Sequence, residues 1–482
     1  MNRPRITLLG SQEEQLLNHL QSHPSGHEKA AVVLFRRLAR PVAGLVDSDR
    51  YVAVKVIPFE ETWVTSSSDS HISFELKYLR DLFRQCEEES LVFGFVHNHP
   101  GGFPDFSNID DGNEHTLLRA LTNRNGTDIR FVAMLWTNNA WKARIRHGLT
   151  PDAAQTVRHI LIHGRPLKLF GYDKSIFDDE NLSARHAAAF GQPFVDKLRA
   201  LRVGVVGAGG TGSPTIMLLA RAGVGELVVI DNDKLESSNL NRVRGAGLSD
   251  IGKNKARILE DFITSLQLPT QITAVESLVD QDPTAIDALS SCDVVFGCTD
   301  DQIGREVLNT ALYVYAQPYI DIGLGGQITE DSQVQPYLRY HYGRVSTILP
   351  ESGECLFCQG VLKDVWIRHQ YALRENPNLE ASEAKERYLE GGGEQAPGVG
   401  PFTSALADYG VATLFDLIKP FRKFPGELRN DLFKLDFIKM ELRSHAEKND
   451  VDCVYCQRRE YLVVPEKYRL NRPILGKPNV AL

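Results

Sequence analysis

The segment Gly207-Ala208-Gly209-Gly210-Thr211-Gly212 constrains the fold of this chain more than any other stretch. It follows the apolar run 202–206 and leads into an apolar pattern of helical spacing at 213–222. Glycines at such a junction allow a tight turn and a close approach of the backbone to a ligand, and the N-terminus of the next helix offers N–H groups to a phosphate. The sequence therefore predicts a nucleotide-binding loop, with Gly207, Gly209, Gly210 and Gly212 as its glycines.

The residues after this loop alternate between strand-like and helix-like segments. Further strands are expected at 226–230, 271–276 and 293–297, and a further helix at 253–266. Alternation of this kind is typical of a doubly wound parallel sheet. We therefore expect a Rossmann-like domain over 185–482.

Polar residues beyond the loop distinguish between two kinds of nucleotide site. Asp231 and Asp233 end the next strand, where a carboxylate accepts hydrogen bonds from ribose hydroxyls. Up to this point an NAD-linked dehydrogenase fits equally well. Arg242 and Lys255 follow, and a pair of cations is needed where negative charge builds on a departing pyrophosphate. Asp300 ends a later strand, where a carboxylate can hold Mg²⁺, so an ATP site is favoured.

With these motifs, 185–456 resembles the ubiquitin-activating superfamily, which includes the ThiF/MoeB-type adenylyltransferases of thiamine and molybdopterin biosynthesis. The similarity includes the glycine loop, the stretches IDND, SNLNR, IGKNKA and GCTDD, and Arg305 with Asn309. It implies ATP and Mg²⁺ as cofactors, with Asp231 at the ribose and Asp300 at Mg²⁺. It also implies a homodimer in which Arg185 reaches the ATP of the other subunit. The phosphate contacts that it implies are those of Asn239, Arg242 and Lys255.

Two cysteine pairs of identical spacing lie in this half of the chain, Cys355-x-x-Cys358 and Cys453-x-x-Cys456. Four thiolates form the tetrahedral set that a structural zinc prefers. A redox pair or two unrelated turns is the alternative. The resembled superfamily carries a zinc site in the same order, and we expect this one to be structural because the protein fills all four positions.

Many ubiquitin-activating enzymes transfer the acyl group from the adenylate to their own cysteine in a crossover region. The polar stretch at about 359–400 is expected to be such a crossover loop, but no cysteine lies between Cys358 and Cys453. Cys86 is in the other half, and Cys292 and Cys298 flank an expected core strand, where cysteine is usually an inert hydrophobe. The chain is thus expected to stop at the acyl-adenylate, to borrow a zinc-ligand cysteine, or to use a hydroxyl; the sequence leaves these alternatives open.

Residues 1–150 have a different organisation. Strands are expected at 30–38, 51–57, 91–96, 128–135 and 140–145, and helical spacing at 74–86. This pattern predicts a separate mixed α/β domain. Residues 151–184 lack a clear period and are expected to be a connector.

A metal-binding pattern follows one of these strands. His97 and His99 precede Pro100, and Asp110 follows eleven residues after His99. Three ligands leave the fourth position of zinc open for water, which is the catalytic arrangement. The order of these residues, with Ser107 three before the aspartate, resembles the JAMM/MPN metalloprotease family.

The JAMM/MPN resemblance implies that His97, His99 and Asp110 bind a catalytic Zn²⁺ and that Ser107 donates to the oxyanion. The general base of the family is a glutamate at its first core strand, and Glu28 occupies that position here. Such a carboxylate takes a proton from the zinc-bound water and returns it to the leaving amine. The alternatives for this role are Glu60, Glu61 and Glu75.

Composition excludes several other classes of function. The net charge of -8 gives no electrostatic footprint for nucleic acid, and no apolar run approaches the length of a membrane helix. The residues after Met1 include only three or four consecutive apolar positions, too few for a secretory signal. We expect a cytoplasmic protein.

Both expected domains act on one chemical group, the C-terminal carboxyl of a ubiquitin-like, β-grasp protein. The sequence thus predicts a bifunctional enzyme of a bacterial-type ubiquitin-like pathway, which adenylates this carboxyl and hydrolyses amides or precursors made from it. A separate cysteine-bearing conjugating protein would then be a partner. One alternative is the trimming and activation of a sulfur-carrier protein for cofactor or cysteine biosynthesis. In another, the first domain is a docking module without activity, but the complete set of metal ligands argues against it.

Overall fold

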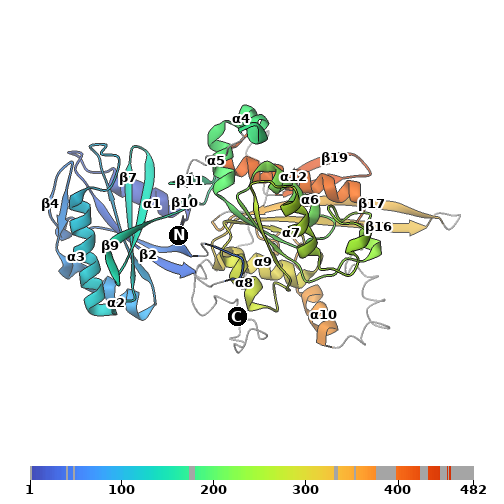
Figure 1. Cartoon of the computed structure of the whole chain (residues 1–482), viewed down its shortest axis with the longest axis horizontal. Helices are drawn as coiled ribbons and strands as arrows, with labels where there is room; N and C mark the ends of the chain where they lie inside the picture. Colours follow the sequence, from blue (N-terminus) through green and yellow to red (C-terminus); the bar gives the residue numbers. More distant parts are fainter. Residues whose placement is uncertain are drawn as a thin grey trace. The chain divides into compact units, whose positions relative to one another are not determined.

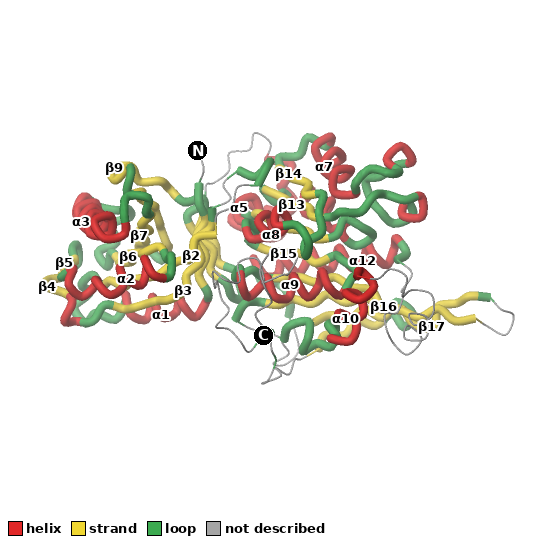
Figure 2. The backbone as a smooth tube through the Cα atoms, turned by 90° about the horizontal axis from the view of Figure 1, so that it is seen from below, coloured by secondary structure: helices red, strands yellow, loops and turns green. Residues whose placement is uncertain are grey.

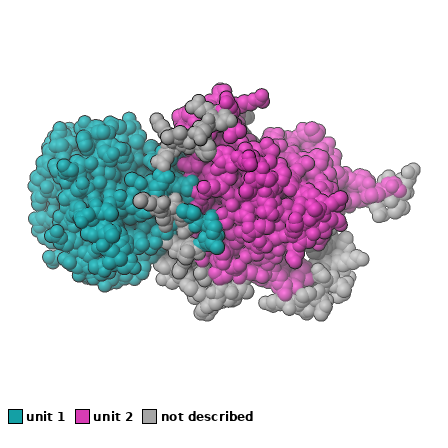
Figure 3. Space-filling view, viewed as in Figure 1, with its two compact units in different colours: residues 1–175 teal, residues 176–482 magenta. Residues whose placement is uncertain are grey.

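The computed structural model describes residues 3–38, 42–46, 49–172, 180–330, 335–351, 354–375, 398–423 and 432–445, together with 453, 455 and 456. The chain forms two compact units, Met1–Ser175 and Ile176–Leu482 (Figure 3). Each unit has its own large sheet. Among the described helices, none combines the length and the apolar character that crossing a membrane requires.

The first unit is built on a nine-stranded mixed sheet with the order β11-β10-β1-β3-β2-β6-β7-β8-β9 (Figure 1). The strands are β1 (Arg5–Leu8), β2 (Ala30–Leu38), β3 (Arg50–Pro58), β6 (Val92–Asn98), β7 (Arg130–Thr137), β8 (Ala140–His147), β9 (Thr150–Thr156), β10 (His159–Ile162) and β11 (Lys168–Phe170). A separate hairpin consists of β4 (Val64–Ser67) and β5 (Ile72–Phe74).

Helices cover both faces of this sheet. Helix α1 (Gly10–Leu20) packs on the face that carries Val33 and Phe35. Helices α2 (Arg80–Glu88) and α3 (Asn108–Asn125) pack on the opposite face, with Val32 and Leu34. Strand β2 is therefore apolar at successive positions because both of its faces are buried. The central strand β6 and the first turn of α3 position the expected metal ligands.

Two expectations for this unit differ from the structure. Helical spacing at 74–86 predicts one helix, but Phe74 ends β5 and the α-helix begins only at Arg80, after a 3₁₀ turn at Leu76–Leu79. Residues 151–184, expected to be a connector, include most of β9 and all of β10 and β11. Strand β10 pairs in parallel with β1, a partner more than 150 residues earlier, so local periodicity does not reveal it. The first compact unit thus extends to Ser175.

The second unit has an eight-stranded sheet with the order β14-β13-β12-β15-β16-β17-β18-β19 (Figure 2). The strands are β12 (Arg202–Val206), β13 (Glu226–Ile230), β14 (Gln271–Val275), β15 (Val294–Gly297), β16 (Tyr319–Glu330), β17 (Pro336–Ile348), β18 (Leu432–Asp436) and β19 (Glu441–His445). The five neighbouring strands β14, β13, β12, β15 and β16 are parallel, as the alternating pattern predicts. The remaining pairs, among β16, β17, β18 and β19, are antiparallel and lie outside the strands expected from the sequence.

Of the helices that the structure describes in the second unit, two precede the first strand, four follow the parallel strands β12 to β15, and two come after β17. They are α4 (Ala184–Phe190), α5 (Gln192–Ala200), α6 (Gly212–Ala222), α7 (Lys255–Ser265), α8 (Pro283–Ser290), α9 (Gln302–Val314), α10 (Asp364–Glu375) and α12 (Gly400–Ile418). Helix α6 packs against both α7 and α12, and α10 packs on α9. Within the expected crossover loop at about 359–400, α10 is helical and residues 376–397 lie outside the described part of the chain.

Candidate functional site

The glycine loop connects β12 to α6 and lines a large cavity of the second unit. Gly207 has a φ of +93°, which favours glycine, and a Cβ at this position would lie 2.6 Å from the carbonyl oxygen of Cys298. The backbone N–H groups of Gly209, Gly210 and Thr211 donate to no other described residue. They therefore remain available to a phosphate at the N-terminus of α6.

Both acidic residues after β13 line the same cavity. The carboxylate of Asp231 accepts the N–H groups of Ala208 at 2.6 Å and of Asp233 at 2.7 Å. Burial raises the pKa of Asp231 above its ordinary value, although these two N–H donors oppose the rise. Asp233 is exposed, and its Oδ2 lies 2.8 Å from Nζ of Lys255. The structure thus brings Lys255 to an acidic pair that lies 22 to 24 residues before it in the sequence.

Asn239 and Arg242 also line the cavity. Asn239 is buried, and its Oδ1 accepts the N–H of Glu236 at 3.2 Å. Nη1 of Arg242 donates to the carbonyl of Ser238 at 2.9 Å. A Cβ at Gly210 would lie 3.0 Å from Cδ of Arg242, so the absence of a side chain at Gly210 leaves room for this arginine beside the loop.

Asp300 follows β15 and presents an exposed carboxylate to the cavity. Nη1 of Arg305 donates to the Asp300 carbonyl at 3.4 Å, and Nε of Arg305 lies 3.5 Å from Oδ1 of the buried Asp321. Oδ2 of Asp321 lies 2.6 Å from Nη2 of Arg344. This cluster supports the segment that carries Asp300. No motif in the sequence points to Asp321 and Arg344, because β16 and β17 bring them to Arg305 only in the folded chain.

Arg185 and Cys298 differ in their relation to the cavity. Arg185 is exposed on α4 and is not among the residues that line the cavity of its own chain. A contact between Arg185 and a nucleotide would therefore come from a second copy, and this stays a prediction.

Cys298 lines the cavity, but burial raises the pKa of its thiol to about 12. A thiol of this kind is a poor nucleophile at neutral pH.

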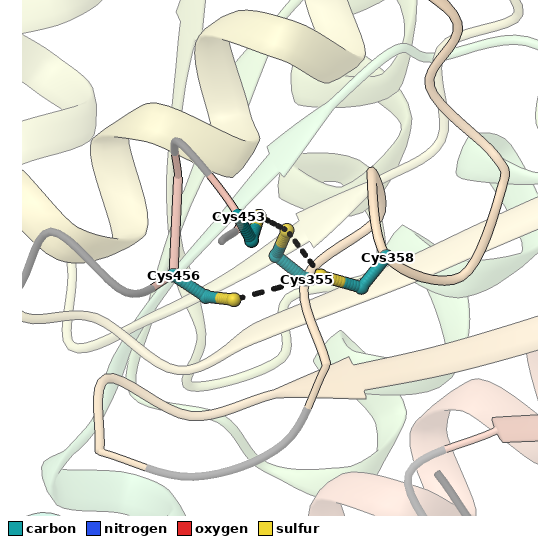
Figure 4. Close-up of side chains that lie close together, drawn as sticks. All are labelled: Cys355, Cys358, Cys453 and Cys456. Atoms are coloured by element: carbon teal, nitrogen blue, oxygen red, sulfur yellow. Dashed lines mark hydrogen bonds between the residues drawn. The ribbon is translucent and has the colours of Figure 1, made fainter. Parts of the chain in front are cut away.

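The four paired cysteines come together in the structure, with their sulfur atoms directed toward one another (Figure 4). Cys355 Sγ lies 3.8 Å from Cys358 Sγ and 3.6 Å from Cys453 Sγ, and Cys358 Sγ lies 3.6 Å from Cys456 Sγ. Zinc–sulfur bonds of about 2.3 Å in a tetrahedron require sulfur separations of about 3.8 Å. These distances fit a Zn²⁺ ion and are far too long for disulfides, whose S–S bond is about 2.05 Å.

A second group of possible metal ligands lies in the first unit. His97 at the end of β6, His99 in the next loop and Asp110 in the first turn of α3 are all buried. Nε2 of His97 lies 3.2 Å from Nε2 of His99 and 2.9 Å from Oδ1 of Asp110, and Nε2 of His99 lies 3.3 Å from Oδ2 of Asp110. Ligand distances of about 2.0–2.1 Å around tetrahedral zinc require edges of about 3.3 Å, so the three residues form one face of such a tetrahedron.

Neighbouring groups orient these ligands. Nδ1 of His99 lies 3.2 Å from the carbonyl oxygen of Phe103, to which it can donate, and this leaves the lone pair of Nε2 for a metal. Burial opposes ionisation of Asp110, but the adjacent imidazoles of His97 and His99 lower its pKa well below the ordinary value. The arrangement thus provides an ionised carboxylate together with two imidazoles.

Glu28 is the only one of the four candidate bases that lies at this centre. Its Oε1 lies 3.8 Å from Nε2 of His99, and its side chain is only 2% exposed. Burial raises the pKa of Glu28 to about 7. Glu60, Glu61 and Glu75 are exposed. A carboxylate with this pKa can accept and return a proton near neutral pH.

Asn98 and Ser107 have structural contacts in the same centre. Oδ1 of Asn98 accepts the N–H of Lys29 at 2.8 Å, so this residue holds the segment beside Glu28. Ser107 is the N-cap of α3, and its hydroxyl donates to Oδ2 of Asp110 at 2.8 Å. The expected donation from Ser107 to an oxyanion would require this hydroxyl to turn away from Asp110.

The sequence profile of the ThiF family matches residues 183–455, more than half of the chain. This chain belongs to the ThiF family. It is 35% identical over 135 residues to the sulfur carrier protein ThiS adenylyltransferase of Escherichia coli, a match that covers 27% of the chain and 53% of the relative. It is 40% identical over 113 residues to the SAMP-activating enzyme E1 of Haloferax volcanii, which covers 23% of the chain and 42% of the relative.

Another relative is the probable adenylyltransferase/sulfurtransferase MoeZ of Mycobacterium tuberculosis, 34% identical over 124 residues, with 26% of the chain and 31% of the relative covered. The ThiF-family chain thus spans about half or less of the length of these relatives. Among solved structures, E. coli MccB with ATP is similar at 20% identity and a TM-score of 0.44, over 58% of this chain and 75% of MccB.

Proposed function

We propose that the ThiF unit adenylates the C-terminal carboxylate of a ubiquitin-like β-grasp protein. The observation that carries the proposal is one cavity lined by a glycine loop with free N–H groups, by Asp231, and by the cations Arg242 and Lys255. The names of the relatives support it, because ThiS and SAMP are the proteins on which two of them act.

In this reaction a carboxylate oxygen of the protein substrate attacks the α-phosphorus of ATP. A bond forms between these two atoms, the bond to the β-phosphate oxygen breaks, and pyrophosphate leaves. Arg242 and Lys255 would stabilise the charge that develops on the leaving group. Asp231 would hold the ribose hydroxyls, and Asp300 would hold a Mg²⁺ ion that neutralises phosphate charge.

We further propose that the acyl group is transferred from the adenylate to a nucleophile of a separate protein, with release of AMP, because the chain has no cysteine between Cys358 and Cys453. A cysteine-bearing conjugating protein is the partner that suits a ubiquitin-like pathway. The exposed position of Arg185 outside the cavity is compatible with its action in the second subunit of a homodimer. The four paired cysteines would hold a structural zinc that fixes the C-terminal segment.

For the first unit we propose zinc-dependent hydrolysis of the amide made from the same carboxyl. A zinc ion held by His97, His99 and Asp110 would supply an activated water. Glu28 would take the proton of the attacking water and transfer it to the leaving amine. The burial of Glu28 beside His99, which raises its pKa to about 7, supports this role.

ATP–pyrophosphate exchange tests the adenylation. The assay uses the full chain with a panel of β-grasp proteins, including E. coli ThiS, and the same proteins with an amidated C-terminus. Exchange should require a free C-terminus and should fall at least 100-fold in Asp300→Asn. Asp364→Asn, which removes an exposed carboxylate of the same cavity, is the matched control. Exchange that proceeds without any protein substrate would refute the proposal.

Cleavage of linear fusions of the same β-grasp proteins tests the hydrolase. Cleavage should stop when zinc is removed and in Glu28→Gln, and it should persist in Glu60→Gln. If Glu28→Gln cleaves normally with zinc bound, the base lies elsewhere. A docking module without activity predicts no cleavage by the wild-type chain.

A sulfur-carrier pathway is the second candidate, and the relative named adenylyltransferase/sulfurtransferase favours it. The activation step is then the same, but the product is a thiocarboxylate rather than a conjugate. Intact-mass analysis of the β-grasp protein, after reaction with a sulfide donor or with a conjugating protein, distinguishes the two outcomes.

A further inference from the structure

The cavity continues beyond the proposed ribose site toward the end of β14. The strand order β14-β13-β12 places the segment 277–280, the acidic pair after β13 and the glycine loop in succession. Neighbouring strands are about 4.8 Å apart. A nucleotide with its phosphates at the glycine loop and its ribose at Asp231 therefore extends its base toward Ser277, Leu278, Val279 and Asp280, which line this end of the cavity.

Asp280 provides a buried charge in this region. Its side chain is 2% exposed, and its Oδ2 forms an ion pair with Nη1 of Arg374 on α10. Nη2 of Arg374 also lies 3.9 Å from Oδ1 of Asp301. Arg374 uses one oxygen of the Asp280 carboxylate, which leaves the other as an acceptor. Both residues line the cavity.

Helix α10 is held in place by a second contact one turn before Arg374. Oε1 of Gln370 accepts the N–H of Gln302 at 2.7 Å and that of Ile303 at 3.2 Å. These N–H groups belong to the first turn of α9, where helix donors lack intrahelical partners. Residues four positions apart share one face of a helix, so Gln370 attaches to α9 the same face of α10 that carries Arg374.

The purine bases differ in the group that they offer to this pair. Adenine carries an exocyclic amino group, a donor, where guanine carries a carbonyl oxygen, an acceptor. An ionised carboxylate only accepts hydrogen bonds. We propose that Asp280, oriented by Arg374, binds the amino group of the base and makes the site selective for ATP over GTP. This inference rests on the nucleotide site of the proposed function.

Equilibrium binding of ATP and GTP to the full chain, in the presence of Mg²⁺, tests the inference by calorimetry. Wild-type protein should bind ATP about 10- to 100-fold more tightly than GTP, because a hydrogen bond to a charged group contributes roughly 1.5–3 kcal/mol. In Asp280→Asn the amide can donate to guanine, so the ratio of the two dissociation constants should fall about tenfold. Arg368→Ala removes an exposed cation from the same helix and should leave the ratio unchanged.

Two further variants separate base recognition from a role in holding α10. Gln370→Ala weakens the attachment of α10 without altering the Asp280 carboxylate, and should weaken ATP and GTP binding equally. Arg374→Lys retains the charge but not the planar fork, and should reduce the ratio. An unchanged ratio in correctly folded Asp280→Asn and Arg374→Lys proteins, with similar losses for both nucleotides, overturns the inference.

The binding measurement also separates this inference from the proposed reaction. If the chain binds ATP selectively through Asp280 but catalyses no pyrophosphate exchange with any β-grasp protein, the inference stands and the proposed adenylation fails. If the chain instead catalyses pyrophosphate exchange equally well with ATP and GTP, the proposed nucleotidyl transfer stands and the inference about Asp280 fails.

Discussion

Substitution of Gly212, the first residue of α6, tests whether the tight junction after β12 determines the stability of the second unit. A Cβ at Gly212 would point at the carbonyl oxygen of Gly207, roughly 1 Å inside the 3.0 Å limit that real Cβ atoms respect. The obstacle is backbone, which cannot rotate away. Gly209 lies in the same loop, and no heavy atom would lie within 4 Å of a Cβ there. Gly212→Ala and Gly209→Ala therefore form a matched pair.

Two effects of opposite sign act at Gly212. Alanine is the better helix former by about 1 kcal/mol, so helix propensity alone predicts that Gly212→Ala stabilises the protein. Overpacking against a fixed group costs about 3 kcal/mol. The net expectation is a loss of about 2 kcal/mol. Unfolding of a unit of about 300 residues has an entropy of roughly 0.6 kcal/mol per kelvin, so its Tm should fall by about 3 °C.

Differential scanning calorimetry measures this effect. The transition of the second unit is the one that ATP shifts in the wild-type chain, since a ligand stabilises the folded unit that binds it. Gly212→Ala should lower this transition and weaken ATP binding at least tenfold, because the N-terminus of α6 must move. Gly209→Ala should change the Tm by less than about 1 °C. A Tm in Gly212→Ala that equals or exceeds the wild-type value would refute the reasoning.

Other predictions concern the metal centres and the buried cysteine. Cys355→Ser should remove one zinc ion per chain in metal analysis, whereas Cys86→Ala, in the core of the first unit, should not. In the metal-free chain the pKa of Glu28 is about 7, against 4.5 for a glutamate in the unfolded chain. The contribution of protonated Glu28 to the free energy of unfolding is therefore fully present below pH 4.5, and this free energy falls by up to about 3 kcal/mol as the pH rises through 7. Urea unfolding in EDTA between pH 4 and 8 should show this loss in wild type and Glu60→Gln but much less of it in Glu28→Gln. Cys298→Ala should retain pyrophosphate exchange within about threefold, because burial keeps this thiol protonated; a complete loss would show that the thiol takes part.

The two metal groups differ in a way that bears on their proposed roles. Four cysteine sulfurs can fill every position of a zinc tetrahedron, so the cluster at Cys355 is suited to hold segments of the chain together. Asn309 on α9 supports it, because its Oδ1 accepts the N–H of Leu356 at 2.9 Å. The group at His97 offers three possible ligands, and the buried carboxylate of Glu28 lies beside them. An open position next to a base is the arrangement that hydrolysis requires.

The sequence by itself determined the local units of this protein. The apolar run 202–206, the glycines after it and the helical pattern beyond correspond to β12, the loop and α6 within a residue. The reason is that strand, turn and helix preferences are set by neighbouring residues. Metal-ligand spacing was also sufficient to predict that His97, His99 and Asp110 come together, because β6 and the first turn of α3 are close in the chain.

Only the tertiary structure decided which distant residues meet. It distinguished Glu28 from the three exposed glutamates, since burial beside His99 depends on the pairing of β2 with β6. It placed β10 beside β1 in the first sheet and β18 beside β17 in the second, because these pairings join segments far apart in the chain. It also brought Arg374 of α10 to Asp280 after β14, 94 residues away. No periodicity or spacing encodes such contacts, because they arise from packing of whole elements.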